Sequence, residues 1–293
     1  MEMIIVNKGI EIKKLIKRYD SNFQLGELSL DIPAGEIIGL IGENGAGKTT
    51  LIKSILDILK INKGEIKIFG KDVKNNETLI KEDIGVVLDN SFFPEVLNAK
   101  DVDSIMKSIY KSWDSNLYYT YLKDFNIPVN SSIKKLSKGM RKKLEIATAL
   151  AHHPKLLILD EPTSGLDPVI RNEVLDIFLK FIEDEKHTIL FSTHITSDLE
   201  HIADEIVFIN DGKILLNKSR DDILDNYGIL KCGLEEFSKI DKKDCVVYKK
   251  NKYNYDILVN DKEKMSKKYK NMVVDKITLE DLMVLMIKGD KTC

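Results

Sequence analysis

The sequence predicts an α/β fold in which helices cover a mostly parallel β-sheet. Four short apolar runs support this prediction, at residues 36–41, 156–159, 188–192 and 205–209. Helix-length connections separate the last three runs, and such alternation is typical of a parallel sheet with covering helices. Each run suits a buried strand but is far shorter than the roughly 18 apolar residues of a membrane-spanning helix. With 293 residues, 43% of them apolar, the chain can form one large core and a small additional domain.

The first part of the chain adds a different pattern. Residues 10–16 and 27–32 alternate like strands, and we expect them to pair antiparallel. Residues 51–59 place apolar side chains on one face of a helix, which Gly64 is expected to end. A further short strand is expected at residues 65–69.

A helical insert is predicted in the middle of the chain. Residues 99–126 are rich in helix formers and aromatic side chains and lack a strand pattern. We therefore expect a first domain at residues 1–225 that contains a helical subdomain at about 90–150.

The C-terminal part of the chain has its own pattern. Residues 245–249 and 253–259 alternate as strands, whereas residues 262–269 and 279–287 have helical patterns. These elements predict a small α+β accessory domain at residues 226–293. The sequence leaves open whether it braces a dimer, regulates the first domain or covers its base.

Charge and composition exclude several classes of protein. A net charge of -2 argues against a surface that binds nucleic acid. The first residues lack the basic region and long apolar stretch of a secretory signal. We therefore expect a protein that is soluble and intracellular on its own and has no nucleic-acid partner.

A phosphate-binding loop lies between an apolar strand and a helix. The segment GENGAGKT at residues 42–49 has the spacing GxxxxGKT. Glycines let backbone N–H groups surround phosphates, and the N-terminus of the following helix adds partial positive charge. Lys48 is expected to contact the β- and γ-phosphates and Thr49 to coordinate Mg²⁺. The alternative, a glycine-rich turn with a surface lysine, rarely has this context.

Two carboxylates follow the apolar run at residues 156–159. Asp160 and Glu161 should emerge at the carboxyl end of this strand, because burying a charge inside it is costly. Open α/β sheets bind ligands at that edge. Asp160 is expected to hold Mg²⁺ and Glu161 to activate water for hydrolysis. Alternatively, Glu161 only caps the turn before Pro162.

With these residues in place, residues 10–220 resemble the ATP-binding subunit of ABC transporters. The LSKGM segment at 136–140 is similar to the signature loop of the family, and the SGLD segment at 164–167 to the loop that crosses the dimer interface. The resemblance implies a P-loop NTPase core of ABC type with an antiparallel β subdomain and a helical subdomain. It also implies that Ser137 and the Gly139 backbone contact a γ-phosphate held by a second subunit.

The resemblance assigns two more positions. His194 follows the apolar run at 188–192 and matches the switch histidine, which contacts the γ-phosphate and helps to align Glu161 with water. Tyr19 occupies the place of the aromatic residue that stacks on adenine, although a surface tyrosine on an edge strand is a competing interpretation. The remaining histidines match no catalytic position and are interpreted as structural or exposed: His152, His153, His187 and His201.

The sequence thus yields a complete set of candidate site residues. The expected catalytic residues are Glu161 and His194. The expected nucleotide-binding residues are Tyr19, Gly42, Glu43, Asn44, Gly45, Ala46, Gly47, Lys48, Thr49, Thr50, Ser137, Gly139 and Asp167. The expected metal ligands are Thr49, Asp160 and Asp89.

Two departures from the family pattern concern these residues. Asp89 stands where the family usually has a glutamine, so a carboxylate replaces a neutral amide and the glutamine's role in sensing a transmembrane partner is not assigned to it. In the signature loop, Lys138 and Met140 replace the commoner glycine and glutamine. Backbone donation from Gly139 survives both changes.

The function implied is that of the ATP-binding and ATP-hydrolysing subunit of a membrane exporter. The departures and the short C-terminal extension look most like ATPases of Gram-positive ABC-2-type exporters, which include pumps for antimicrobial peptides and phenol-soluble modulins. The expected partners are a transmembrane permease, a second identical or different ATPase subunit and, through the permease, a peptide or small amphipathic substrate.

The sequence also leads to expectations about where the subunit lies, which cofactors it uses and which other functions are possible. The subunit is expected at the cytoplasmic side of the cell membrane, with ATP and Mg²⁺ as cofactors. Phe92 and Phe93 either dock the permease or pack the helical insert. The alternatives are a soluble ABC ATPase or sensor with no transport role, or an importer subunit.

Overall fold

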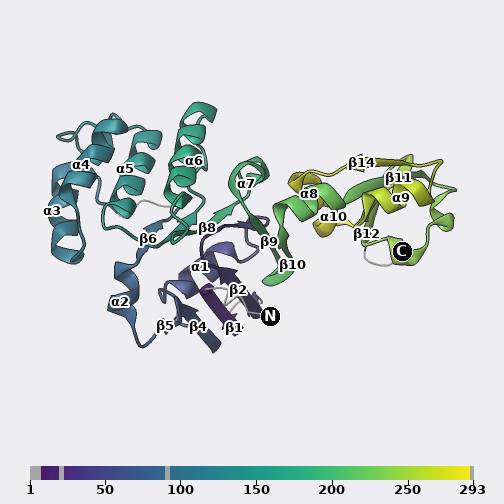
Figure 1. The fold of residues 1–293 in the computed structure, drawn as a ribbon, viewed down its shortest axis with the longest axis horizontal. Helices are drawn as coiled ribbons and strands as arrows, with labels where there is room; N and C mark the ends of the chain where they lie inside the picture. Colours follow the sequence, from purple (N-terminus) through teal and green to yellow (C-terminus); the bar gives the residue numbers. More distant parts are fainter. Residues whose placement is uncertain (1–7, 20–22, 90–92, 291–293) are drawn as a thin grey trace.

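A computed structural model describes residues 8–19, 23–89 and 93–290 (Figure 1). The chain forms an elongated molecule in which the helices α3, α4 and α5 lie at one end and the C-terminal elements at the other. In these described residues no helix combines the length and the apolar character needed to cross a membrane.

A six-stranded sheet forms the centre, with the strand order β10-β9-β3-β8-β7-β6. All neighbours are parallel except β10, which pairs antiparallel with β9. The strands are β3 (Ile37–Ile41), β6 (Ile84–Val87), β7 (Leu156–Asp160), β8 (Thr188–Thr193), β9 (Glu205–Asn210) and β10 (Lys213–Ser219). This arrangement confirms the predicted α/β fold with a mostly parallel sheet.

The second sheet is antiparallel and has the order β2-β1-β4-β5. Its strands are β1 (Lys8–Arg18), β2 (Gln24–Pro33), β4 (Lys63–Ile68) and β5 (Lys71–Asp72). Alternate residues of β1 and β2 point inward, as period-two patterning requires. Ile10 and Ile12 of β1 and Leu30 of β2 are buried against the central sheet.

Along the chain, most of the helices connect one strand to the next. They are α1 (Lys48–Ile55), α2 (Glu77–Glu82), α3 (Ala99–Ile109), α4 (Ser115–Asp124), α5 (Lys138–Leu150), α6 (Pro168–Ile182), α7 (Thr196–Ile202) and α8 (Arg220–Asn226). Helices α3, α4 and α5 share a small core of their own around Val102, Tyr118 and Leu144. The predicted helical insert is therefore a packed group of helices joined to the sheet through α5.

The C-terminal region contains a third sheet with the order β12-β13-β11-β14. Its elements are β11 (Gly228–Gly233), β12 (Val247–Lys250), β13 (Asn254–Val259), α9 (Lys262–Lys268), β14 (Val273–Lys276) and α10 (Leu279–Lys288). Strands β11 and β14 do not correspond to any strand expected from the sequence.

The central strands are buried on both faces, so each feeds two cores. In β3, Ile37 and Ile41 belong to one core and Ile38 and Leu40 to the other. This is why the strand reads as a continuous apolar run instead of alternating.

One helix differs from its prediction. Helix α1 starts at Lys48 and ends at Ile55, well before Gly64, which lies within β4. The backbone leaves the helix because Asp57 adopts the left-handed region with φ 54°. The apolar spacing continues beyond the helix because Leu56 packs on the core in a turn.

Candidate active site

The phosphate loop connects β3 to α1 and has the conformation that its glycines permit. Gly47 is the N-cap of α1 and has φ 110°, which strongly favours glycine. At Gly42, a Cβ atom would lie 2.2 Å from the Ile209 carbonyl oxygen of the neighbouring strand. Both positions therefore exclude larger residues, and the loop follows the sheet edge closely enough to present its backbone at the helix N-terminus.

Lys48 lies folded back over this loop. Its Nζ donates to the carbonyl oxygens of Gly42 at 2.7 Å and Glu43 at 3.3 Å. The same ammonium lies 3.5 Å from Oε1 of Glu161, and only 5% of the residue is exposed. The loop thus holds a buried cation next to the predicted catalytic carboxylate.

Asp160 is the last residue of β7 and is 1% exposed. Its Oδ2 accepts a hydrogen bond from the Thr49 hydroxyl at 2.8 Å. A buried carboxylate needs such donors because desolvation is otherwise costly. Two of the three predicted metal ligands are therefore in direct contact.

Glu161 follows at the end of the same strand, and its backbone adopts the left-handed region with φ 51°. A residue with a Cβ atom occupies this region at a cost of about 1–2 kcal/mol. The turn directs the carboxylate between two partners, with Oε1 near Lys48 and Oε2 accepting from Nδ1 of His194 at 2.7 Å. The two predicted catalytic residues thus form a hydrogen-bonded pair.

A polar cavity of about 390 Å³ opens in front of the loop. Its lining residues are Tyr19, Phe23, Glu43, Asn44, Gly45, Gly47, Lys48, Thr49, Thr50, Asp89 and Glu161. The Tyr19 hydroxyl lies 3.4 Å from the Thr50 hydroxyl, and the residue is 40% exposed. Asp89 faces the same cavity although it lies beyond β6, so the structure brings it to the predicted metal ligands.

The signature segment lies apart from this cavity. Among the described residues that line it, none comes from 136–140. Ser137 is the exposed N-cap of α5 and accepts from the backbone N–H of Met140 at 3.2 Å. A Cβ atom at Gly139 would lie 3.1 Å from Ile170 of α6, whose N-cap is Asp167. The structure therefore groups Ser137, Gly139 and Asp167 separately from the phosphate loop.

The other histidines have structural contacts. Nε2 of His152 lies 2.9 Å from the Ile84 carbonyl oxygen, and burial lowers the pKa of this imidazole. Nδ1 of His187 lies 2.7 Å from the Phe181 carbonyl oxygen, and His153 pairs with Asp114 at 3.4 Å. These contacts, and the exposure of His153 and His201, agree with the interpretation of the four histidines as structural or exposed residues.

Two residues at the site were missed by sequence reasoning. Phe23 lines the cavity next to Tyr19, with ring centroids 6.1 Å apart. Ser192, in β8, donates a hydrogen bond to Oδ1 of Asp160 at 2.5 Å. A hydroxyl within the apolar run at 188–192 was a signal for the second residue, but its alignment with Asp160 depends on the strand register.

Comparison with known proteins bears on this geometry. Residues 25–164 match the ABC transporter family. The chain is 31% identical to the ABC transporter ATP-binding protein YtrB of Bacillus subtilis (strain 168) over 218 residues. The aligned region covers 74% of this chain and 74% of that protein. The chain belongs to the ABC transporter family. It is therefore an ATP-binding subunit of a transporter and an ATP hydrolase, and the predicted ABC-type fold is confirmed.

Two further similarities extend the comparison. The bacitracin transport ATP-binding protein BcrA of Bacillus licheniformis is 35% identical over 208 residues, 70% of this chain and 68% of that protein. A solved structure described as a dimeric post-hydrolysis state of the ATP-binding cassette MJ0796, bound to ADP and Pi, has a TM-score of 0.65 and 22% identity. It covers 72% of this chain and 98% of that chain, and at this identity it supports the fold.

Proposed function

We propose that this ABC ATPase powers a membrane exporter as one of two subunits that enclose two ATP molecules head to tail. Each ATP would lie between the phosphate loop of one subunit and Ser137 of the other. The observation that carries the proposal is the separation of the two phosphate-binding elements within one chain. The polar cavity contains Lys48 and Glu161, whereas Ser137 caps an exposed helix N-terminus outside it.

The oxygen-bearing side chains of the cavity fit a magnesium ion. Mg²⁺ prefers hard oxygen ligands and usually keeps only one or two protein carboxylates. The Thr49 hydroxyl and the Asp160 carboxylate are in contact, and Asp89 faces the same cavity. When bound, Mg²⁺ would neutralise charge on the terminal phosphates. These three residues are the ones we propose to hold it.

The chain's own groups would then carry hydrolysis. Glu161 is placed to accept a proton from the attacking water, and His194 holds its carboxylate in position through Oε2. The Lys48 ammonium, now 3.5 Å from Glu161, would move to the β- and γ-phosphates when ATP enters. The tyrosine ring of Tyr19 is exposed at the cavity mouth, where an adenine could stack on it.

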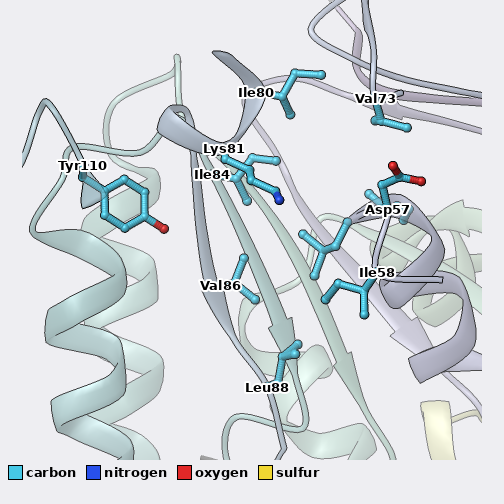
Figure 2. Close-up of a pocket in the computed structure, with 11 residues that line it drawn as sticks. Asp57, Ile58, Val73, Ile80, Lys81, Ile84, Val86, Leu88 and Tyr110 are labelled. Atoms are coloured by element: carbon cyan, nitrogen blue, oxygen red, sulfur yellow. The ribbon is translucent and has the colours of Figure 1, made fainter. Parts of the chain in front are cut away.

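An apolar groove supports contact with a permease. A cavity of about 330 Å³ lies along β6, which is an edge strand of the central sheet. Figure 2 shows Val86 on this strand and Leu88 directly after it, with Tyr110 on one side and Ile58 on the other. Ile58 is 58% exposed and Val86 37% exposed. We propose that an amphipathic helix of the permease docks here.

The position of this groove would link transport to ATP. The strand that lines it leads directly to Leu88 and then to Asp89, which faces the nucleotide cavity. Phe93 lines an adjoining cavity of about 190 Å³ and also packs against the helical core, so both interpretations of this residue have support. Phe92 lies outside the described residues.

The cargo and the location follow from the same proposal. The relative BcrA is a bacitracin transport protein, which favours a peptide or small amphipathic cargo here. Docked on the permease, the subunit would lie at the cytoplasmic side of the membrane. The segment 226–293 is proposed to be an accessory domain that is packed on the ATPase, as its shared core indicates.

The decisive experiment uses Glu161→Gln in complex with its permease, to be isolated as a membrane protein that co-purifies with this chain. Removing the base should leave ATP bound but not hydrolysed, so ATP should lock two subunits together in single-particle images. The matched control is the double variant with Ser137→Glu, whose added charge should repel the γ-phosphate and prevent closure while ATP still binds. A Glu161→Gln complex that binds ATP but keeps its subunits apart would contradict the proposal.

A second measurement separates export from its alternatives. The wild-type complex in lipid vesicles should show ATPase activity that rises with amphipathic antimicrobial peptides, and the peptides should accumulate on the side opposite the ATPase. Accumulation on the ATPase side would indicate an importer. ATP hydrolysis by a chain that binds no membrane protein and whose rate no membrane protein changes would indicate a soluble ATPase.

A further inference from the structure

A buried hydroxyl lies directly beside the proposed metal site. Ser192 is the fifth residue of β8 and has no exposed surface. In the parallel pairing of β7 with β8 it lies opposite Asp160, and its hydroxyl donates to Oδ1 of that carboxylate at 2.5 Å. The contact crosses two neighbouring strands of a rigid sheet, so its geometry is fixed by the strand register.

The two carboxylate oxygens of Asp160 accept hydrogen bonds from two different residues, Ser192 and Thr49. Oδ1 accepts from Ser192 and Oδ2 accepts from Thr49 at 2.8 Å. Rotation of the carboxylate would break both hydrogen bonds in an interior where Asp160 is 1% exposed. Oδ2 is the oxygen that contacts Thr49, and Thr49 lines the nucleotide cavity.

Ser192 also holds the neighbouring residue through its backbone. Its carbonyl oxygen accepts the Glu161 N–H at 3.0 Å, at the point where the chain enters the left-handed conformation. One residue of β8 thus contacts both carboxylate-bearing residues at the end of β7. Its side chain acts on Asp160 and its main chain on Glu161, so the two effects can be separated by mutation.

We propose that Ser192 is a positioning residue that makes Asp160 a one-oxygen ligand, direct or through water, and thereby selects Mg²⁺ over Ca²⁺. Mg²⁺ demands near-ideal octahedral geometry, whereas Ca²⁺ accepts two-oxygen carboxylate ligands and variable coordination. Hydrogen-bonded partners of metal ligands commonly change metal affinity by about 10–100-fold when they are mutated. The inference rests on the proposed role of Asp160 in holding the metal, and not on pairing of the subunits.

The test is Ser192→Ala, which removes the hydroxyl without adding volume. The probe is Mg²⁺ or Ca²⁺ titrated against a fluorescent, non-hydrolysable ATP analogue on the full chain. We expect the half-saturating Mg²⁺ concentration to rise about tenfold, with a smaller change for Ca²⁺. Affinity for the analogue in EDTA should not change, because Lys48 and the phosphate loop are untouched. Binding of Mn²⁺ followed by electron paramagnetic resonance gives a second readout that is independent of activity.

The matched control is Thr188→Val in the same strand. Thr188 is equally buried, and its hydroxyl accepts from the Gly35 N–H at the opposite end of β8. This variant loses a buried hydroxyl but should keep the wild-type metal dependence. Ser192→Thr retains the hydroxyl and should keep the Mg²⁺ affinity close to that of the wild type. If the extra methyl group of threonine prevents folding, Ser192→Cys is used in place of Ser192→Thr.

Two results would overturn the inference. One is an unchanged Mg²⁺ requirement in Ser192→Ala. The other is an equal loss of nucleotide affinity with and without metal, which would show a purely structural role. Because these titrations are read on single subunits, they are independent of the pairing experiment above. A wild-type chain that binds neither Mg²⁺ nor Mn²⁺ in the presence of the analogue would refute the proposed metal ligands themselves.

Discussion

At the scale of single residues, the two adjacent carboxylates of the site are held in different ways. Asp160 is buried and receives two hydroxyl donors, so its position is rigid. Glu161 lies beyond the strand and is held by charged or ionisable partners, Lys48 and His194. Entry of ATP would withdraw Lys48 from this carboxylate. Glu161 would then be free to accept a proton while His194 keeps its orientation.

The first prediction concerns His194. His194→Ala removes the hydrogen bond to Oε2 of Glu161 and should lower ATP turnover by about 10²-fold, the lower end of the range for general base catalysis. Nucleotide affinity should change little, because the phosphate loop supplies most of the phosphate contacts. Steady-state hydrolysis and equilibrium binding of a nucleotide analogue check the two parts.

The control for this prediction is His201→Ala. His201 lies exposed near the end of α7 and has no part in the proposed site. It should hydrolyse ATP at the wild-type rate. If His194→Ala kept more than about half of the turnover, the proposed alignment of Glu161 by this histidine would be wrong.

At the scale of elements, the two ends of the central strands have opposite characters. The carboxyl ends of β3, β7 and β8 lead to the phosphate loop, Asp160 and His194. Acidic residues lie at the amino ends of β3 and β9 instead. Glu36 immediately precedes β3, and Glu205, the first residue of β9, lies opposite Ile38 of β3 in the parallel register. Burial raises the pKa of Glu36, and the charges of Glu205 and Asp204 raise it further.

The second prediction follows from the sign of this shift. A carboxyl whose pKa is higher in the folded state favours folding when protonated, and this contribution is lost as the pH rises through the folded pKa. Ionised Glu36 therefore opposes folding at neutral pH. Glu36→Gln should increase the free energy of unfolding at pH 7 by about 0.5 kcal/mol, a typical size for charges near a surface.

Urea unfolding at two pH values tests this prediction. The gain from Glu36→Gln should shrink at pH 4, where the wild-type carboxyl is largely protonated. Glu235→Gln is the control, since Glu235 is exposed and far along the chain from this acidic group. A gain at pH 4 as large as that at pH 7 would show that charge is not its origin.

Much of the fold was predictable because its elements depend on local patterns. The continuous apolar runs of β3, β7, β8 and β9 identify buried parallel strands, and the glycine spacing identifies the loop before α1. The C-terminal strands β11 and β14 were missed because neither shows a long apolar run or a sustained alternation, although β11 is as long as β13. Pairing with β13 and with each other stabilises them instead of a strong apolar pattern.

The candidate site was predictable from local patterns too, except where a contact depends on which residues of neighbouring strands lie opposite each other. Lys48, Thr49 and Asp160 are identified by motifs, and chain topology brings the ends of β3 and β7 together. Phe23 and Ser192 required three-dimensional information, because their roles depend on which residues lie opposite them. Sequence also gave no sign that Glu161 would adopt a left-handed backbone.

At the scale of the whole molecule, the C-terminal region is continuous with the ATPase. Helix α10 packs on α7, and the backbone N–H of Leu279 donates to the Glu200 carboxylate of α7 at 2.6 Å. Leu279, Leu282 and Leu285 belong to the same core as Leu199 of α7. The opposite face of the C-terminal sheet has a separate core beneath α9, around Leu230 and Met265.

The third prediction is that the two cores respond differently to mutation. Leu282 is fully buried in the shared core, so Leu282→Ala should lower the free energy of unfolding by about 2–5 kcal/mol. It should also lower the midpoint temperature of the thermal transition that shifts upward when nucleotide binds. Met265→Ala removes a similarly buried side chain from the separate core and should shift this transition less. Thermal unfolding with and without an ATP analogue distinguishes the nucleotide-dependent transition. Equal shifts from both variants would mean that the C-terminal region unfolds with the ATPase as one unit. No shift from Leu282→Ala would mean that α10 does not stabilise the helix that follows His194.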